Sequence, residues 1–154
     1  MAKEIERKFL IDAEKWAKQG NPVEMCQGYL AINGDKIIRV RIAGNNAFIT
    51  IKGNLQGISR DEFEYEIPVD DARQLMDLCE GNPVEKTRYK YLFAGKMWEI
   101  DLFHGANNGL IVAEIELNSE DEPFEKPSWI GEEVSTESKY YNFNLSQNPF
   151  TNWQ

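Results

Sequence analysis

The sequence contains few of the histidine and cysteine side chains that form common metal and redox sites. It contains one histidine, His104, and its two cysteines, Cys26 and Cys79, lie outside any zinc or CxxC spacing. A histidine-rich metal centre is therefore excluded, and the isolated thiols suit a reducing cytoplasm. No apolar run approaches the roughly 18 residues of a membrane span. The N-terminus is charged from Lys3 onward and lacks the apolar core of a signal peptide, so we expect a cytoplasmic protein without a membrane partner.

Positive charge is also scarce. The net charge of −9 argues against general nucleic-acid binding, although a local basic cluster can still hold a small anion. The chain has neither a P-loop nor a glycine-rich dinucleotide fingerprint, so side chains rather than a helix N-terminus would grip any phosphate. At 154 residues with 42% hydrophobic residues, the sequence predicts one globular domain over residues 1–154.

The periodicity of the chain predicts a mainly β (α+β) protein. Alternating apolar residues and turn signals predict eight strands, near residues 4–11, 27–32, 36–42, 47–52, 58–67, 86–91, 97–103 and 110–117. Capping residues predict short helices near residues 13–19, 70–79, 119–122 and 136–141. The proline-containing segment 123–131 is expected to be irregular.

Most of the predicted strands carry two residues of like charge at positions i and i+2, which share one face of a strand. These pairs are Glu4/Glu6, Arg39/Arg41, Glu62/Glu64, Lys86/Arg88, Glu99/Asp101 and Glu114/Glu116. A solvated outer face would explain each pair alone. Eight strands can also close into a barrel that holds a small ligand. Charged faces pointing inward would be too costly if dry and unpaired, but would suit a wet tunnel that holds a polyanion and a hard cation, Mg²⁺ or Mn²⁺.

The order of these motifs resembles the CYTH, or triphosphate tunnel metalloenzyme, superfamily, in its short single-domain bacterial branch. The resemblance covers most of the chain and begins with the ExExK signature. It rests on Glu4-Ile5-Glu6-Arg7-Lys8, Gln27-Gly28-Tyr29-Leu30, Arg39-Val40-Arg41, Thr50-Ile51-Lys52-Gly53, the segment from Arg60 to Ile67, Glu85-Lys86-Thr87-Arg88-Tyr89, Glu99-Ile100-Asp101 and Ala113-Glu114-Ile115-Glu116.

The resemblance implies an eight-stranded antiparallel β-barrel tunnel with a few flanking short helices and a divalent-metal-dependent triphosphatase site inside. The implied metal ligands are Glu4, Glu6, Glu114 and Glu116. The implied triphosphate-binding residues are Lys8, Arg39, Arg41, Lys52, Lys86, Arg88 and Lys139. Supporting carboxylates would be Glu62, Glu64 and Asp101.

Three residues are assigned a catalytic role on the same grounds: Lys8, Lys86 and Tyr29. Tyr29 would accept a proton, but a free tyrosine has a pKa near 10, so nearby cations would have to lower it. A structural hydrogen bond from the Tyr29 hydroxyl is the alternative. Lys139 would close one end of the tunnel over the substrate, or else be a surface lysine.

The expected activity is metal-dependent hydrolysis of inorganic tripolyphosphate. Thiamine or nucleoside triphosphate hydrolysis, a class IV-type adenylyl cyclase and a non-catalytic polyphosphate-binding module are the alternatives. Aromatic side chains at the tunnel mouth would favour an organic triphosphate, but the four tryptophans cannot be placed from the sequence. An exposed flank of the barrel could support a homodimer.

Overall fold

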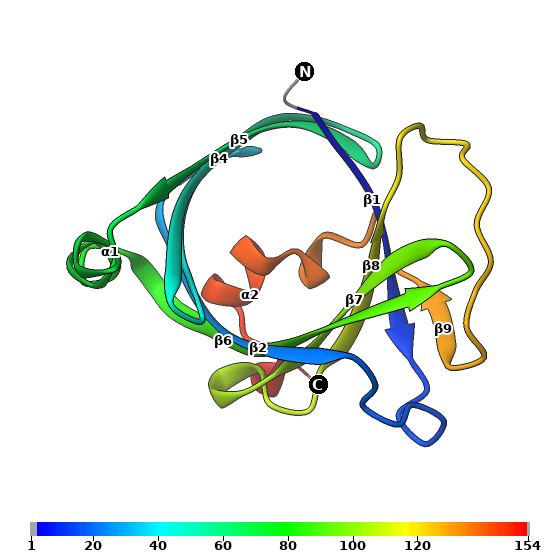
Figure 1. Cartoon of the computed structure of the whole chain (residues 1–154). Helices are drawn as coiled ribbons and strands as arrows, with labels where there is room; N and C mark the ends of the chain where they lie inside the picture. Colours follow the sequence, from blue (N-terminus) through cyan, green and yellow to red (C-terminus); the bar gives the residue numbers. More distant parts are fainter. Residues whose placement is uncertain (1–2, 154) are drawn as a thin grey trace.

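The structure is a computed structural model in which residues 3–153 are described, and it is built around one antiparallel sheet (Figure 1). The strands are β1 (Lys3–Ile11), β2 (Asn21–Asn33), β3 (Lys36–Ala43), β4 (Asn46–Gln56), β5 (Ser59–Ile67), β6 (Glu80–Phe93), β7 (Lys96–Phe103), β8 (Ile111–Glu116) and β9 (Ile130–Glu133). The helices are α1 (Val69–Met76) and α2 (Asn142–Gln147), with the short 3-10 helices η1 (Gly105–Asn107), η2 (Ser138–Tyr140) and η3 (Phe150–Asn152).

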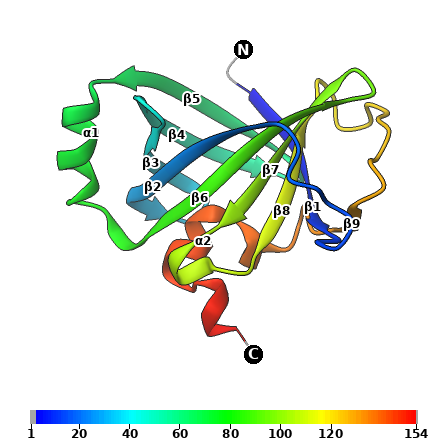
Figure 2. The same cartoon turned by 60° about the horizontal axis from the view of Figure 1, so that its bottom comes forward.

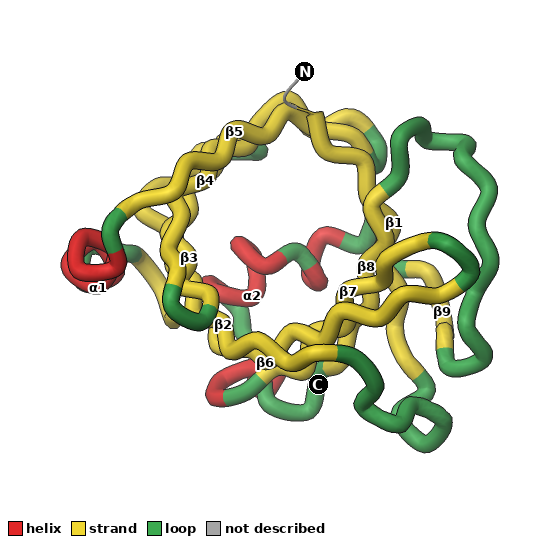
Figure 3. Tube along the Cα trace, viewed as in Figure 1, coloured by secondary structure: helices red, strands yellow, loops and turns green. Residues whose placement is uncertain are grey.

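The sheet closes on itself. Its strands run in the order β5-β4-β3-β2-β6-β7-β8-β1, and β5 pairs back to β1 through Lys3 opposite Asp61 and Glu4 opposite Arg60. The predicted eight-stranded antiparallel barrel is thereby confirmed (Figure 3). The ninth strand, β9, adds to the far end of β1, where Ile11 lies opposite Ile130.

One end of the barrel is filled by an apolar core. The C-terminal segment with η2 and α2 lies across this end (Figures 1 and 2). Its Tyr140 and Leu145 pack with inward-facing residues of the strands, among them Tyr29, Val84 and Phe103. The charged part of the interior therefore lies beyond a hydrophobic floor.

Two further apolar clusters lie outside the barrel. The larger contains three tryptophans (Trp16, Trp98 and Trp129), packed on β1, β7 and β8 and covered by the segment that leads to β9. The smaller lies under α1 and includes Val40 and Ala72. Each strand thus presents its apolar face outward over much of the wall, the reverse of an ordinary globular sheet.

Two helices predicted from the sequence are absent from the described structure. Residues 13–15 form a turn and residues 16–19 have no regular structure, where Lys18 takes a left-handed conformation and Trp16 packs edge-on against Tyr89. Residues 119–122 form a turn in which the Asn118 amide donates to the Glu122 carboxylate. The segment expected to be irregular, 123–131, lacks regular structure as far as residue 129, and its last two residues begin β9. In the described chain, no helix is long and apolar enough to cross a membrane.

Candidate functional site

The barrel interior holds a cavity of about 440 Å³, a size that suits a small ligand. Seven of its eight strands contribute charged side chains to the wall; β2 contributes Val23, Met25 and Tyr29. The charged lining residues are Glu4, Glu6, Lys8, Arg39, Arg41, Lys52, Arg60, Glu62, Glu64, Arg88, Lys90, Glu99, Glu114 and Glu116.

Strand register explains why these residues meet. Side chains two apart share a face, so the like-charged pairs all point inward once the apolar residues between them pack outside. Glu6 lies opposite Glu116 and Lys8 opposite Glu114 across β1 and β8, and Glu99 lies opposite Glu114 across β7 and β8. One wall of the cavity is therefore rich in carboxylates.

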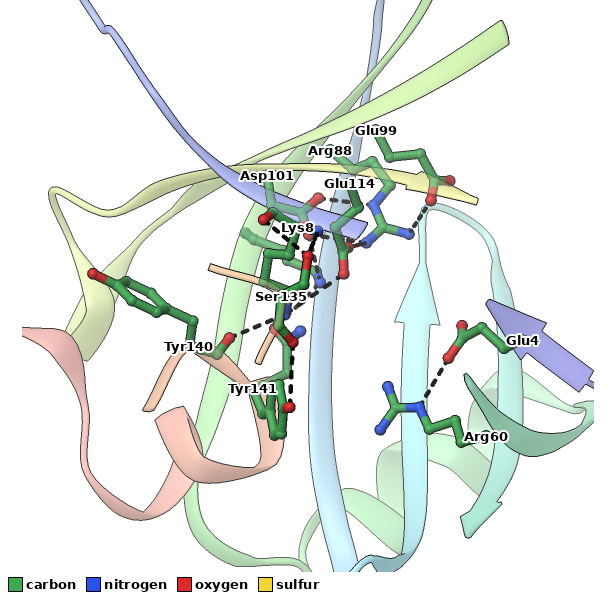
Figure 4. Close-up of polar contacts among 12 residues, drawn as sticks. Glu4, Lys8, Arg60, Arg88, Glu99, Asp101, Glu114, Ser135, Tyr140 and Tyr141 are labelled. Atoms are coloured by element: carbon green, nitrogen blue, oxygen red, sulfur yellow. Dashed lines mark hydrogen bonds and ion pairs between the residues drawn. The ribbon is translucent and has the colours of Figure 1, made fainter. Parts of the chain in front are cut away.

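A buried ion network joins β6, β7 and β8 (Figure 4). Arg88 donates from Nε and Nη2 to the two carboxylate oxygens of Asp101, at 2.8 and 2.9 Å. Lys86 Nζ lies 2.9 Å from Asp101 Oδ2. Arg88 also donates to Glu114 at 3.2 Å, and Lys8 Nζ lies 3.6 Å from Glu114 Oε2. Every charge in this network has an opposite partner, as a buried charge requires.

Burial and these partners set the pKa values of the network. Burial lowers the pKa of Lys86 to about 7, with Asp101 opposing and Arg88 adding to the decrease. For Asp101, burial acts to raise the pKa, but Arg88 and Lys86 outweigh it and hold the value at about 2. Burial acts in the same direction on Glu114, yet Lys8 and Arg88 hold its pKa far below the usual range. Both carboxylates are thus ionised at neutral pH.

A second network ties β1 to β4 and β5. The Glu4 carboxylate accepts hydrogen bonds from Lys52 at 3.1 Å and from Arg60 at 2.9 Å, and Lys52 also pairs with Glu62 at 3.2 Å. Burial acts to raise the pKa of Glu4, but Lys52 and Arg60 outweigh it and hold the value well below the usual range. Glu4 therefore forms ion pairs with two basic side chains at once.

The arginines of β3 have separate partners. Arg39 donates to Thr50 at 3.1 Å and to Glu64 at 3.3 Å. Arg41 donates to the fully buried Gln27 amide oxygen at 3.1 Å, and the Gln27 amide nitrogen donates to the Tyr29 hydroxyl at 2.9 Å. Burial, with Arg39 and Arg88 nearby, lowers the pKa of Arg41 to about 10.

Tyr29 lines the cavity, but its environment differs from the one that a base would need. Burial raises the pKa of the Tyr29 hydroxyl, and the opposing effect of Arg39 is smaller. The hydroxyl accepts a hydrogen bond from Gln27, so its own proton is free to be donated.

Glu6 and Glu116 differ from the other carboxylates of the cavity wall, because neither forms an ion pair with a base in the part of the chain that the structure describes. Burial, together with the charges of Glu114 and Glu4, raises the pKa of Glu6 strongly, and its carboxyl group shares a hydrogen bond with Glu114. The nearby Glu116 is exposed, and burial with several neighbouring carboxylates raises its pKa as well. Within residues 3–153, no three carboxylate, histidine or cysteine side chains are gathered closely enough to form a ready-made metal cage.

The C-terminal segment forms the floor of the cavity. Tyr141, Asn142 and Phe143 line it, and Lys8 Nζ donates to the backbone carbonyl of Tyr140 at 3.0 Å (Figure 4). Lys86 Nζ donates to the Asn142 side chain at 3.4 Å. Lys8 and Lys86, both predicted to bind the substrate, thus also donate hydrogen bonds to the segment that closes the barrel.

Some predicted site residues lie away from the cavity wall. Lys86 and Asp101 are buried behind Arg88, and Lys139 lies over the rings of Tyr140 and Trp153, with its ammonium 4.8 Å from the Trp153 ring centre. Trp153 itself packs edge-on against Tyr140, and none of the four tryptophans lines the cavity.

Three residues that line or support the site were not assigned a site role from the sequence: Arg60, Lys90 and Gln27. Arg60 shares its strand face with Glu62 and Glu64, and Lys90 shares its face with Arg88, so the alternation held the signal for both. Gln27 stands two residues before Tyr29, on the same face, but only the fold reveals its contact with Arg41.

Comparison with known proteins matches this chain over nearly its whole length. A family model of the CYTH domain matches residues 2–148. An inorganic triphosphatase of Acetivibrio thermocellus is 45% identical over 155 residues, covering 100% of this chain and 99% of that protein. An inorganic triphosphatase of Nitrosomonas europaea is 41% identical over 147 residues, covering 90% of this chain and 93% of that protein.

Solved structures give the same result. The crystal structure of an inorganic triphosphatase superimposes with a TM-score of 0.68 at 35% identity, covering 92% of this chain and 96% of that one. A protein of Pyrococcus horikoshii superimposes with a TM-score of 0.61 at 23% identity over 77% of this chain and 80% of its own, a likeness that concerns the fold.

Proposed function

The chain belongs to the CYTH domain family, and on that premise we propose that it is a divalent-metal-dependent hydrolase of inorganic tripolyphosphate, folded as one domain over residues 1–154. The observation that carries the proposal is the cavity: a closed barrel with a hydrophobic floor, arginine and lysine side chains around most of its wall, and excess carboxylate on one side. The near relatives that are inorganic triphosphatases support the same substrate.

In this proposal the phosphates lie among the basic residues. Lys8, Arg39, Arg41, Lys52 and Arg88 reach the cavity from four strands, so they surround a linear polyanion instead of contacting it from one side. Arginine suits this role because its planar donors pair with two phosphate oxygens at once. We add Arg60 to the set, because it lines the same cavity. Lys86 and Lys139 would act less directly, since neither reaches the wall in this structure.

The residues present fit a divalent cation. Burial and the negative charges of Glu114 and Glu4 raise the pKa of Glu6, and a hard cation with oxygen ligands would offset the same negative charge. Glu4, Glu6, Glu114 and Glu116 would hold Mg²⁺ or Mn²⁺. Two of them also pair with bases of the wall: Glu4 with Lys52 and Arg60, and Glu114 with Arg88 and Lys8. Bound there, the ion would supply charge neutralisation for the phosphates and a more acidic water.

The protein's own contribution is positioning and charge. Phosphoryl transfer to water needs little covalent chemistry from a protein, but it needs the phosphorus held in line with the attacking water and the leaving oxygen. The arginines would hold the non-bridging oxygens, and Lys8 would balance charge that develops on the phosphates beside Glu114. Tyr29 would donate a hydrogen bond to a phosphate oxygen, because its raised pKa favours the protonated hydroxyl. The structure therefore supports Tyr29 as a hydrogen-bond donor at the cavity better than as a general base.

Inorganic tripolyphosphate is preferred over an organic triphosphate because the tryptophans, which could have stacked on a base, pack elsewhere. Phe48 does line the cavity. It is a single ring beside the β3–β4 turn, so it gives an organic substrate weak support.

The test is phosphate release from tripolyphosphate, measured beside ATP, thiamine triphosphate and pyrophosphate, with and without Mg²⁺ or Mn²⁺. We expect metal-dependent turnover of tripolyphosphate well above the others. Glu6→Gln should abolish it, while the control Glu66→Gln, on an exposed side chain of β5 outside the cavity wall, should not. Cyclic AMP from ATP, or tight binding without any turnover, would overturn the proposal.

A further inference from the structure

A cluster of hydrogen bonds lies on the outside of the barrel, behind the site. Thr87 of β6 is 6% exposed, and its hydroxyl oxygen lies 2.6 and 3.0 Å from the two carboxylate oxygens of Glu24 on β2. The same hydroxyl lies 2.7 Å from Nε2 of His104, the residue that follows β7. We call these three residues the outer clamp.

The direction of each hydrogen bond follows from the donors available. Thr87 has one hydroxyl proton, and a carboxylate can only accept, so Thr87 donates to Glu24. The oxygen of Thr87 then accepts from His104, which must carry its proton on Nε2. The His104 backbone amide also donates to the Glu85 carbonyl at 2.9 Å. Side-chain and main-chain bonds therefore join β2, β6 and the end of β7 at one place.

The outer clamp lies on the opposite face of β6 from the buried ion network. Thr87 points outward between Lys86 and Arg88, whose side chains point inward to Asp101. Glu24 likewise points outward between Val23 and Met25, two residues that line the cavity. Asp101 lies opposite Arg88 on β7, so the clamp spans the strands whose relative position sets the Arg88–Asp101 contact.

We propose that Thr87 is a positioning residue for triphosphate binding, which holds β6 between β2 and β7 so that Arg88 keeps its place in the cavity wall. A guanidinium that grips phosphate with two donors tolerates little displacement, and a hydroxyl bonded on both sides restricts the strand that carries it. This inference rests on the proposed function, because it assigns Thr87 to the same substrate.

The test is the affinity for inorganic tripolyphosphate without divalent metal, measured by calorimetry, together with KM and kcat in the presence of Mg²⁺. Thr87→Val keeps the shape of the side chain and removes its hydrogen bonds. We expect it to weaken binding and raise KM about fivefold or more, roughly the effect of one or two lost hydrogen bonds, with a smaller change in kcat. Thr87→Ser, which keeps the hydroxyl, should bind within about twofold of the wild type.

Two further variants separate positioning from general damage. Tyr89→Phe removes a hydroxyl from the same outer face of β6 while keeping the ring that packs on Trp16, and should bind as the wild type does. His104→Ala acts on a partly exposed side chain and should reproduce part of the loss even if Thr87→Val folds poorly, with His104→Gln restoring some of it because its amide can donate.

A double-mutant cycle shows whether Thr87 acts through Arg88. If it does, Thr87→Val should weaken binding less in an Arg88→Lys background than in the wild type. Full additivity, or wild-type affinity in both Thr87→Val and His104→Ala, would overturn the inference and leave the proposed function intact. A wild-type protein that neither binds nor hydrolyses tripolyphosphate would instead remove the proposed function, and the inference with it.

Discussion

Replacing Asp101 with asparagine is the sharpest probe of the buried charges. Asp101 is 1% exposed and is the shared partner of Arg88, through two hydrogen bonds, and of Lys86. Asparagine keeps the shape of the side chain, but it leaves two buried cations without their counter-charge and turns an amide group toward one of them. Removing one member of a buried ion pair costs about 3–5 kcal/mol of unfolding free energy. For a chain of this size that corresponds to a melting temperature lower by roughly 6–20 °C.

The cost should depend on pH in a defined direction. Lys86 has a folded-state pKa of about 7, below its unfolded value of 10.5, so it is charged in the folded protein at pH 6 and largely neutral at pH 9. Asp101, with a folded pKa of about 2, is ionised at both pH values. At pH 6 the substitution removes the partner of two cations, and at pH 9 of one. The destabilisation should therefore be larger at pH 6 than at pH 9.

Urea unfolding followed by tryptophan fluorescence measures both quantities. Asp70→Asn is the matched control, because the Asp70 side chain is 88% exposed and pairs with Arg73 at 3.3 Å on the surface of α1. It should change the unfolding free energy by no more than about 0.5 kcal/mol. A loss below about 1 kcal/mol for Asp101→Asn at pH 6, with an unchanged dependence on urea, would refute the reasoning.

Three further outcomes are expected. Gly81→Ala should lower the unfolding free energy by about 1–3 kcal/mol, because the added carbon would lie 2.6 Å from the Ser146 carbonyl oxygen of α2. The control is Gly95→Ala, which is also at positive φ but has open space around it, so it measures the cost of the backbone conformation alone. Thermal unfolding of both variants gives the comparison. Tyr29→Phe should lower kcat about tenfold at most if Tyr29 donates a hydrogen bond, and a thousandfold loss would identify it as a base. Arg41→Ala should chiefly raise KM for tripolyphosphate, whereas Lys139→Ala should change it little if Lys139 stays over Trp153.

The barrel and the direction of its charged faces could be predicted, because both depend on period-two alternation. That pattern can be recognised from residues two positions apart in the sequence. Glu4, Glu6 and Lys8 were expected on one face, and all three line the cavity. The register that places Glu6 opposite Glu116 is a long-range feature. Inward-pointing charged faces exclude a slip of one residue but allow a slip of two, so the alternation alone leaves this pairing open.

What could not be predicted depends on packing between distant segments. Alternation puts Lys86 on the same face as Arg88, but it cannot show that the C-terminal segment occupies that end of the barrel and covers Lys86. The helix expected at residues 13–19 had its capping residue in Asp12, yet packing of Trp16 on Tyr89 decided the conformation. Lys139 was expected either to close the tunnel over the substrate or to be a surface lysine. Its side chain is exposed, and its ammonium lies over the rings of Tyr140 and Trp153.

The two glutamates of the N-terminal motif show how far one pattern can be interpreted. The sequence pattern does not distinguish Glu4 from Glu6, since both are carboxylates on one strand face. In the fold Lys52 and Arg60 outweigh burial and lower the pKa of Glu4, while burial and the charges of Glu114 and Glu4 raise the pKa of Glu6. Their contacts therefore differ: Glu4 pairs with Lys52 of β4 and Arg60 of β5, whereas Glu6 lies beside Glu114, and of these two proposed metal ligands we rank Glu6 before Glu4. A strand pattern fixes which side chains share a space, and the partners brought by other strands decide what each one does there.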